Sequence, residues 1–161
     1  MKMKILVALI IGAFSLSVFG QEDWQKQIEK IRPLITTEAE VEKILGKATE
    51  RFSNIGEYNT KDGRFDVWYS EGKCLPVFNG KYNVEKGVII LYNFRPKKKI
   101  KFASLGIDVS GLETVVPKDM WPPPITYYNP DKGIDYTVYK GILNFVYVYQ
   151  SNDLDNLQCS E

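Results

Sequence analysis

The residues that could carry chemistry in this sequence are carboxylates, because histidine is absent from all 161 positions. Its absence excludes Ser–His–Asp and Cys–His catalysis, histidine proton shuttles and zinc sites that need a His ligand. The two cysteines are too few for a four-cysteine zinc site. Acid–base chemistry would therefore have to use Asp or Glu side chains.

Two pairs of carboxylates are candidates for such chemistry. Asp66 and Glu71 flank a Trp-Tyr pair, and Asp131 and Asp135 lie around a predicted hairpin turn. A retaining glycosidase needs two carboxyl groups about 5 Å apart in a cleft. Neighbouring acids are common in a chain with 20 acidic residues, so these pairs by themselves do not indicate an active site. A carboxylate-dependent, carbohydrate-active enzyme is therefore the alternative hypothesis. We expect the protein not to be an enzyme.

The first twenty residues have the pattern of a secretory signal peptide. Lys2 and Lys4 precede an apolar run from Ile5 to Phe19, which is shorter than the roughly 20 residues that span a bilayer. Small residues favour cleavage after Gly20, and no cysteine follows that could carry a lipid anchor. We expect a periplasmic or secreted chain that begins at Gln21, with residues 21–161 forming a single domain.

The cysteines, Cys74 and Cys159, are predicted to form a disulfide, since an even number of cysteines in an exported chain is typical of one. They are 85 positions apart, and a bridge over a loop of that length stabilises the fold by about 4–5 kcal/mol in the chain-entropy model. The alternative is two unpaired thiols. A catalytic thiol is not expected without a histidine to activate it.

The charge pattern limits the partners. Loss of the two leader lysines changes the net charge from +1 to −1, so we expect neither nucleic-acid binding nor a general attraction to anionic membranes. The mature chain has no apolar run that could span a membrane, and no glycine loop or calcium loop implies a cofactor. The basic run 95–101 could bind phosphate groups, but a solvated turn or a lysine-protected strand edge explains it better.

Periodicity predicts two short helices followed by strands. The first helix covers 22–32, with apolar residues at i, i+4 and i+7. The second follows Thr37, has Glu40 at capping-box spacing and ends at Gly46. We expect these helices to form a hairpin.

Strands are predicted where the apolar period becomes two or a short apolar run appears, namely at 51–58, 64–70, 87–94, 125–128, 134–139 and 142–150. Residues 100–105 fit a short strand or a crossover. The stretch 110–116 is ambiguous in its pattern and could form one helical turn. The predicted fold class is therefore α+β, with an N-terminal helical hairpin packed on one antiparallel sheet of about six strands.

Aromatic side chains supply the candidate binding surface. Simple alternation in the last strand places Leu143, Phe145, Tyr147 and Tyr149 on one face, which either packs on another layer or binds a partner. The individual candidates are rings from the middle and the last third of the chain: Tyr82, Trp121, Tyr127 and Tyr128. Burial in the core is the alternative for each of them. Trp121 begins a Trp-Pro-Pro-Pro segment that fits a connection across the end of the sheet.

The segment TTEAEVEKILGKATERF and the later YSEGKC resemble two related groups of exported proteins. One is the β-lactamase-inhibitor-protein-like modules, and the other is the small outer-membrane assembly lipoproteins of the SmpA/OmlA type. The matching stretch is residues 35–74. The resemblance implies a helix pair packed on one face of an antiparallel sheet.

These features together predict an exported, non-enzymatic binding or inhibitor-like module. Its partner would be another protein or an envelope component. A purely structural envelope protein is a further alternative, which would have no exposed aromatic surface. The sequence does not specify an oligomeric state.

Overall fold

The computed structural model describes residues 23–72, 74–77 and 80–150. The predicted signal peptide and Cys159 lie outside these residues. In the described part of the chain, none of the helices has the length and apolar character needed to cross a bilayer.

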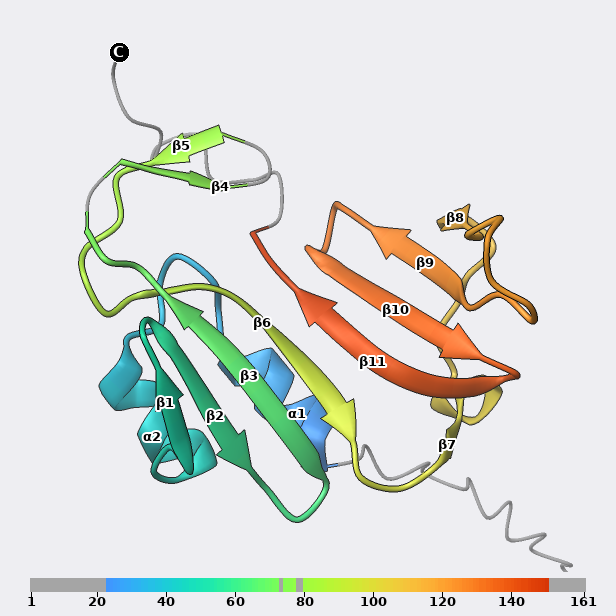
Figure 1. Cartoon of the computed structure of the whole chain (residues 1–161), viewed down its shortest axis with the longest axis horizontal. Coiled ribbons are helices and arrows are strands. Elements are labelled where there is room, and N and C mark those ends of the chain that lie inside the picture. The colour runs from blue at the N-terminus through green and yellow to red at the C-terminus, as the bar shows by residue number, and fades with distance from the viewer. Residues whose placement is uncertain (1–22, 73, 78–79, 151–161) are drawn as a thin grey trace, which may run out of the picture.

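The chain folds into two short helices and a large antiparallel sheet (Figure 1). The helices are α1 (Asp23–Lys30) and α2 (Glu38–Leu45), and a 3-10 turn η1 covers Phe102–Leu105. The strands are β1 (Glu50–Phe52), β2 (Ile55–Asn59), β3 (Gly63–Tyr69), β4 (Leu75–Val77), β5 (Gly80–Tyr82), β6 (Ile89–Pro96), β7 (Ile100–Lys101), β8 (Glu113–Val115), β9 (Ile125–Asn129), β10 (Ile134–Tyr139) and β11 (Ile142–Val148).

The main sheet has nine strands in the order β1-β2-β3-β6-β11-β10-β9-β8, with β7 pairing with β11, and β4–β5 forms a separate small sheet. The α+β prediction with an antiparallel sheet is confirmed, but the estimate of six strands is too low. The predicted strand 51–58 is divided because Ser53 adopts a positive φ of 56° and reverses the chain. In the ambiguous stretch 110–116, residues 113–115 form a strand.

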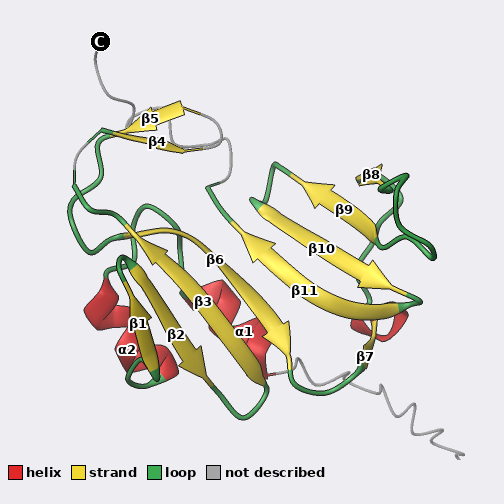
Figure 2. Ribbon diagram, viewed as in Figure 1, coloured by secondary structure: helices red, strands yellow, loops and turns green. Residues whose placement is uncertain are grey.

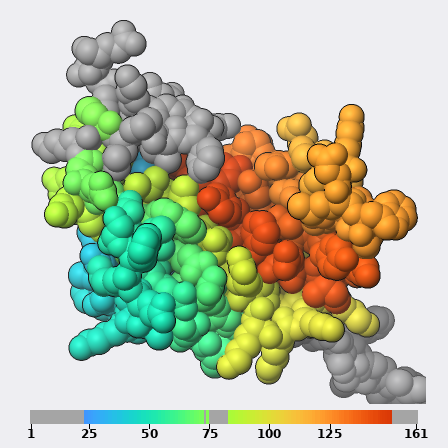
Figure 3. Space-filling model, in the orientation of Figure 1, coloured from blue at the N-terminus to red at the C-terminus, as the bar shows by residue number. Residues whose placement is uncertain are grey.

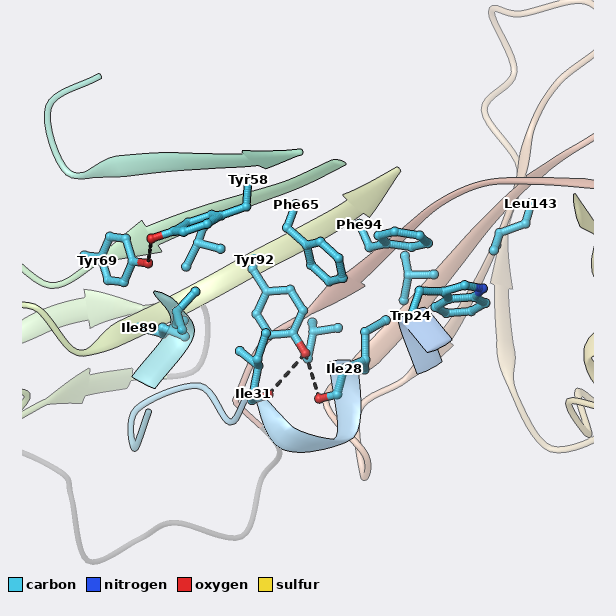
Figure 4. Close-up of a cluster of buried hydrophobic side chains, with 14 of the residues drawn as sticks. Trp24, Ile28, Ile31, Tyr58, Phe65, Tyr69, Ile89, Tyr92, Phe94 and Leu143 are labelled. Carbon is cyan, nitrogen blue, oxygen red and sulfur yellow. Dashed lines mark hydrogen bonds between the residues drawn. The ribbon is translucent and has the colours of Figure 1, made fainter. Parts of the chain in front are cut away.

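Both helices lie on one face of the sheet, behind the strands in Figures 1 and 2. The Trp24 ring of α1 stacks on Phe94 of β6, with 4.9 Å between ring centroids. The buried hydroxyl of Tyr92 donates to the carbonyl oxygens of Ile28 at 3.0 Å and Ile31 at 3.1 Å (Figure 4). These contacts fix α1 against the central strand. The two helices do not form a clear hairpin on the sheet, so that part of the prediction is not met.

The same face of the sheet is covered further along by η1. The Phe102 ring stacks on the Tyr127 ring of β9, with 5.1 Å between ring centroids. It also packs at a tilt against the Tyr136 ring of β10, with 5.7 Å between centroids. The helices and η1 therefore bury one continuous face, which we call the core face. The side chains of β3 show the strict alternation that this requires, because Phe65 and Val67 are buried and Asp66 between them is only half-buried.

A β-bulge in β11 corrects the predicted faces of the last strand. Thr137 pairs with Phe145, but the next residue of β10, Val138, pairs with Leu143, so Asn144 is the extra residue. The bulge moves Leu143 onto the core face with Val146 and Val148. Simple alternation had placed it with Phe145, Tyr147 and Tyr149.

Candidate functional site

The second face of the main sheet, here called the outer face, is turned toward the viewer in Figures 1 and 3, opposite the helices. In-register pairing aligns one residue from each of eight strands across it. We call this line of residues the outer row. In the order of the strands it consists of Glu50, Glu57, Asp66, Asn93, Tyr147, Asp135, Tyr128 and Glu113.

The outer row is acidic, with five carboxylates and no lysine or arginine. Glu50, Glu57 and Asp66 are direct cross-strand neighbours, and like charges in such positions are unfavourable. Arg64, which lies beside the row on β3, relieves part of this repulsion. Its guanidinium lies 3.3 Å from Glu57 and 3.1 Å from Asp66.

Asp135 is the most buried member of the outer row, with a relative exposure of 8%. Its Oδ1 accepts hydrogen bonds from the Tyr149 hydroxyl at 2.9 Å and from the Asn129 amide at 3.3 Å. Burial raises the pKa of this carboxyl, although the bonds from Tyr149 and Asn129 oppose the shift. Within the part of the chain that the structure describes, no lysine or arginine forms an ion pair with Asp135.

Three half-buried tyrosines surround this carboxylate. Tyr147 and Tyr128 are the cross-strand neighbours of Asp135 on either side, and Tyr149 contacts it through its hydroxyl. Burial raises the pKa of Tyr147 and Tyr149, and the nearby Asp135 charge raises both pKa values further. The phenols of Tyr147 and Tyr149 are therefore protonated at neutral pH. We call Asp135 with these three tyrosines the Asp135 site.

The structure separates the first pair of predicted carboxylates. Asp66 lies in the middle of β3 and is paired with Arg64. Glu71 follows the end of that strand and lines an open polar cavity of about 670 Å³ with Arg51 and Lys86. The strand from Asp66 to its end at Tyr69 already spans about 10 Å, about twice the separation of the two carboxyl groups in a retaining glycosidase, and Glu71 lies beyond that end.

The second pair is divided between two environments. Asp131 is exposed in the turn between β9 and β10, whereas Asp135 is buried in the outer row. Among the described residues, Asp, Glu and Cys side chains form no cluster of three or more that could hold a metal ion.

The four predicted binding residues do not all lie on one element of the fold. Tyr127 and Tyr128 are consecutive in β9 and face opposite sides, so Tyr127 packs on Phe102 in the core and Tyr128 joins the outer row. Trp121 is 94% exposed in the connection between β8 and β9, and Tyr82 lies in the separate sheet, in β5. Whether any of these rings contacts a partner stays a prediction.

The structure brings Tyr147, Tyr149 and Asp135 together with Tyr128. Alternation in the last strand had already placed the first two on one face. The signal missing from the sequence was strand register, which alone brings Asp135 of β10 and Tyr128 of β9 beside them.

A second cavity lies on the core face, between α1 and strands β10–β11. It has a volume of about 490 Å³ and a mixed lining, in which Trp24, Ile134 and Val148 supply apolar surface and Arg32 and Lys132 supply positive charge. Its lining lacks the aligned carboxylates and amide of the outer row.

Comparisons with models of protein families, with curated proteins and with solved structures find no significant match to this chain. The resemblance to inhibitor-like and assembly-lipoprotein modules therefore stays an expectation.

Proposed function

We propose that the protein is an exported, non-enzymatic binding module whose outer face contacts a protein of the cell envelope. The observation that carries this proposal is the outer row, a line of carboxylates, an amide and tyrosines that follows one register across eight strands. No helix of the described chain covers this face (Figure 1). Glu50 and Glu113 at the two ends of the row are exposed, whereas its central members are half-buried or buried.

A row of apolar side chains next to the outer row supports the proposal that this face binds a partner. Phe52, Ile55 and Trp68 are consecutive cross-strand neighbours on β1, β2 and β3, and Phe52 is 81% exposed. Aromatic anchors beside a polar rim are typical of the residues that dominate binding energy at protein interfaces. The alignment of like charges costs folding stability, which is reasonable for a surface selected for binding.

Two matched tryptophan substitutions test the proposal. The mature chain 21–161 is immobilised and used to capture partners from an envelope extract of its host. Trp68→Ala, on the outer face, is expected to lose the captured protein, whereas Trp121→Ala in the exposed β8–β9 connection is expected to retain it. Glu113→Lys, an exposed charge reversal in the outer row, provides a second outer-face variant. Circular dichroism melting curves confirm that each variant is folded.

Retention of the partner by both outer-face variants, with loss in Trp121→Ala, would move the binding surface to the β8–β9 connection. Repeated capture of nothing by the wild-type chain would contradict a binding function.

The alternative of a carboxylate-dependent enzyme is favoured by one observation, the buried Asp135 with its raised pKa. A carboxyl group whose pKa is raised by burial is a candidate general acid. The alternative predicts turnover of a chromogenic glycoside panel that disappears in Asp135→Asn. Absence of turnover by the wild-type chain would leave the binding module as the better explanation.

A further inference from the structure

Asp135 presents a buried carboxylate whose charge is not compensated by a nearby cation of the described chain. Buried carboxylates in proteins are ordinarily paired or fully hydrogen-bonded, because removal from water disfavours the charged form. Both recorded hydrogen bonds to Asp135 reach the same atom, Oδ1. Among the described residues, Oδ2 has no hydrogen-bond partner. The site therefore offers one acceptor oxygen and one negative charge to a ligand.

The surrounding rings favour a cation as that ligand. Tyr147 and Tyr128 lie on the strands next to Asp135, and each is about 4.8 Å away in the hydrogen-bonding direction of the sheet. A group held above the Asp135 carboxylate would lie between these two side chains and beside Tyr149. Cations are attracted to the faces of tyrosine rings, most strongly where water is displaced.

The hydrogen bonding of the Asp135 carboxylate also distinguishes between the two common cationic side chains, arginine and lysine. An arginine fork forms its best pair with a carboxylate when both oxygens accept, one from each N–H. Oδ1 of Asp135 already accepts two hydrogen bonds, from Tyr149 and Asn129. A lysine ammonium is a compact charge that needs only one carboxylate oxygen.

On the basis of the proposed function, we infer that the Asp135 site binds the ammonium group of a lysine side chain presented by the partner protein. The ammonium donates to Oδ2 of Asp135 and lies among the rings of Tyr128, Tyr147 and Tyr149. The remaining carboxylates of the outer row extend the complementarity, since the row has no lysine or arginine of its own. The partner would accordingly present a basic surface.

A purely structural role for Asp135 is the competing explanation. The carboxylate bonds the Asn129 amide at the end of β9 and could serve only to fix the β9–β10 turn. Asp135→Asn separates the two roles, because the amide oxygen of Asn can accept both existing bonds while the negative charge is lost. Asp131→Asn is the matched control, since it removes one exposed carboxylate from the neighbouring turn.

The experiment is an NMR titration of the mature chain with Nα-acetyl-lysine methylamide. The norleucine derivative, which lacks the ammonium, and the arginine derivative are the comparison ligands. We expect the lysine derivative to shift the resonances of Asp135 and its three tyrosines and to lower the pKa of the Asp135 carboxyl at saturation. Asp135→Asn should weaken binding about tenfold or more, as expected for loss of a charge-assisted hydrogen bond, whereas Asp131→Asn should bind like the wild type.

Equal shifts with the norleucine derivative, tighter binding of the arginine derivative, or equal losses in the two Asn variants would each overturn the inference. The envelope capture separates this failure from that of the proposed function. If Trp68→Ala loses the partner and Asp135→Asn retains it with wild-type affinity, the outer face binds the partner without a lysine in the Asp135 site. If no outer-face variant affects capture, the proposed function itself fails.

Discussion

The hydroxyl of Tyr92 lies 3.0 Å from the carbonyl oxygen of Ile28 and joins the central strand β6 to the C-terminal half of α1. The same hydroxyl reaches the Ile31 carbonyl, just beyond the helix. The last four carbonyl groups of a helix lack the regular i+4 amide partner, and the Ile28 carbonyl accepts a bond from the Ile31 amide, at 3.2 Å. Tyr92 therefore satisfies helix-end acceptors and fixes the helix on the sheet, and all three residues are buried (Figure 4).

Tyr92→Phe is expected to lower the free energy of unfolding by about 1–3 kcal/mol, because two buried carbonyl groups lose a donor. Tyr136→Phe is the matched control, since Tyr136 also lies on the core face and its hydroxyl has no recorded hydrogen bond among the described residues. Urea denaturation of both variants measures the difference. Equal stability losses would show that the Tyr92 hydroxyl does not hold α1.

Gly63 is required by close packing at the start of β3. A Cβ at this position would lie 2.3 Å from the Arg95 carbonyl oxygen and 2.6 Å from the Phe94 ring. Gly63→Ala should therefore destabilise the fold by about 2–3 kcal/mol through overpacking. Gly111→Ala has open space around the new methyl group and should change stability by less than about 1 kcal/mol. Thermal and urea unfolding of the two variants test the contrast, which a similar effect at both positions would contradict.

The start of α2 should contribute a pH-dependent increment of stability. The Oε2 atom of Glu40 accepts hydrogen bonds from the Thr37 amide and hydroxyl, both at 2.8 Å, and these bonds lower the pKa of Glu40 below its usual value. The increment is therefore complete above the unfolded-state pKa and disappears as pH falls through the lower folded-state pKa.

Glu40→Ala should accordingly be less stable than the wild type at pH 7, and the gap should close in acid as Glu40 of the wild type becomes protonated. Denaturant midpoints at pH 7 and at successively lower pH values measure the gap. A stability difference that does not change with pH would exclude the Glu40 carboxylate as its source.

The disulfide between Cys74 and Cys159 stays a prediction, since Cys159 lies outside the described residues. Non-reducing peptide mapping by mass spectrometry should recover the linked pair from exported protein. Reduction, or the double substitution to serine, should lower stability by about 4 kcal/mol on the chain-entropy estimate. Alkylation of both thiols in native exported protein without prior reduction would refute the pairing.

Export and cleavage also stay predictions. Expression of all 161 residues in a Gram-negative host should deliver a chain whose N-terminus is Gln21 to the periplasm or medium, because the leader has a cleavable signal pattern. Intact-mass measurement of the fractionated protein identifies the terminus. Accumulation of the uncleaved chain in the cytoplasm would argue against a signal peptide.

The sequence predicted the features that depend on neighbours along the chain. The helix after Thr37 begins and ends where the capping box and Gly46 indicate. The β10–β11 turn is tight because Lys140 and Gly141 both adopt positive φ, as a two-residue hairpin requires. The alternation in β3 correctly separated its buried and half-buried side chains. These patterns depend on local backbone geometry, which a few consecutive residues determine.

The tertiary structure decided how the strands align. Four direct neighbours in the outer row come from four different strands. They are Asn93 of β6, Tyr147 of β11, Asp135 of β10 and Tyr128 of β9. One residue of slippage would have turned each side chain to the other face, and the bulge at Asn144 changes the phase within β11 itself. Short-range periodicity cannot fix such non-local pairing, because register depends on packing of the whole core face around Trp24, Tyr92 and Phe102.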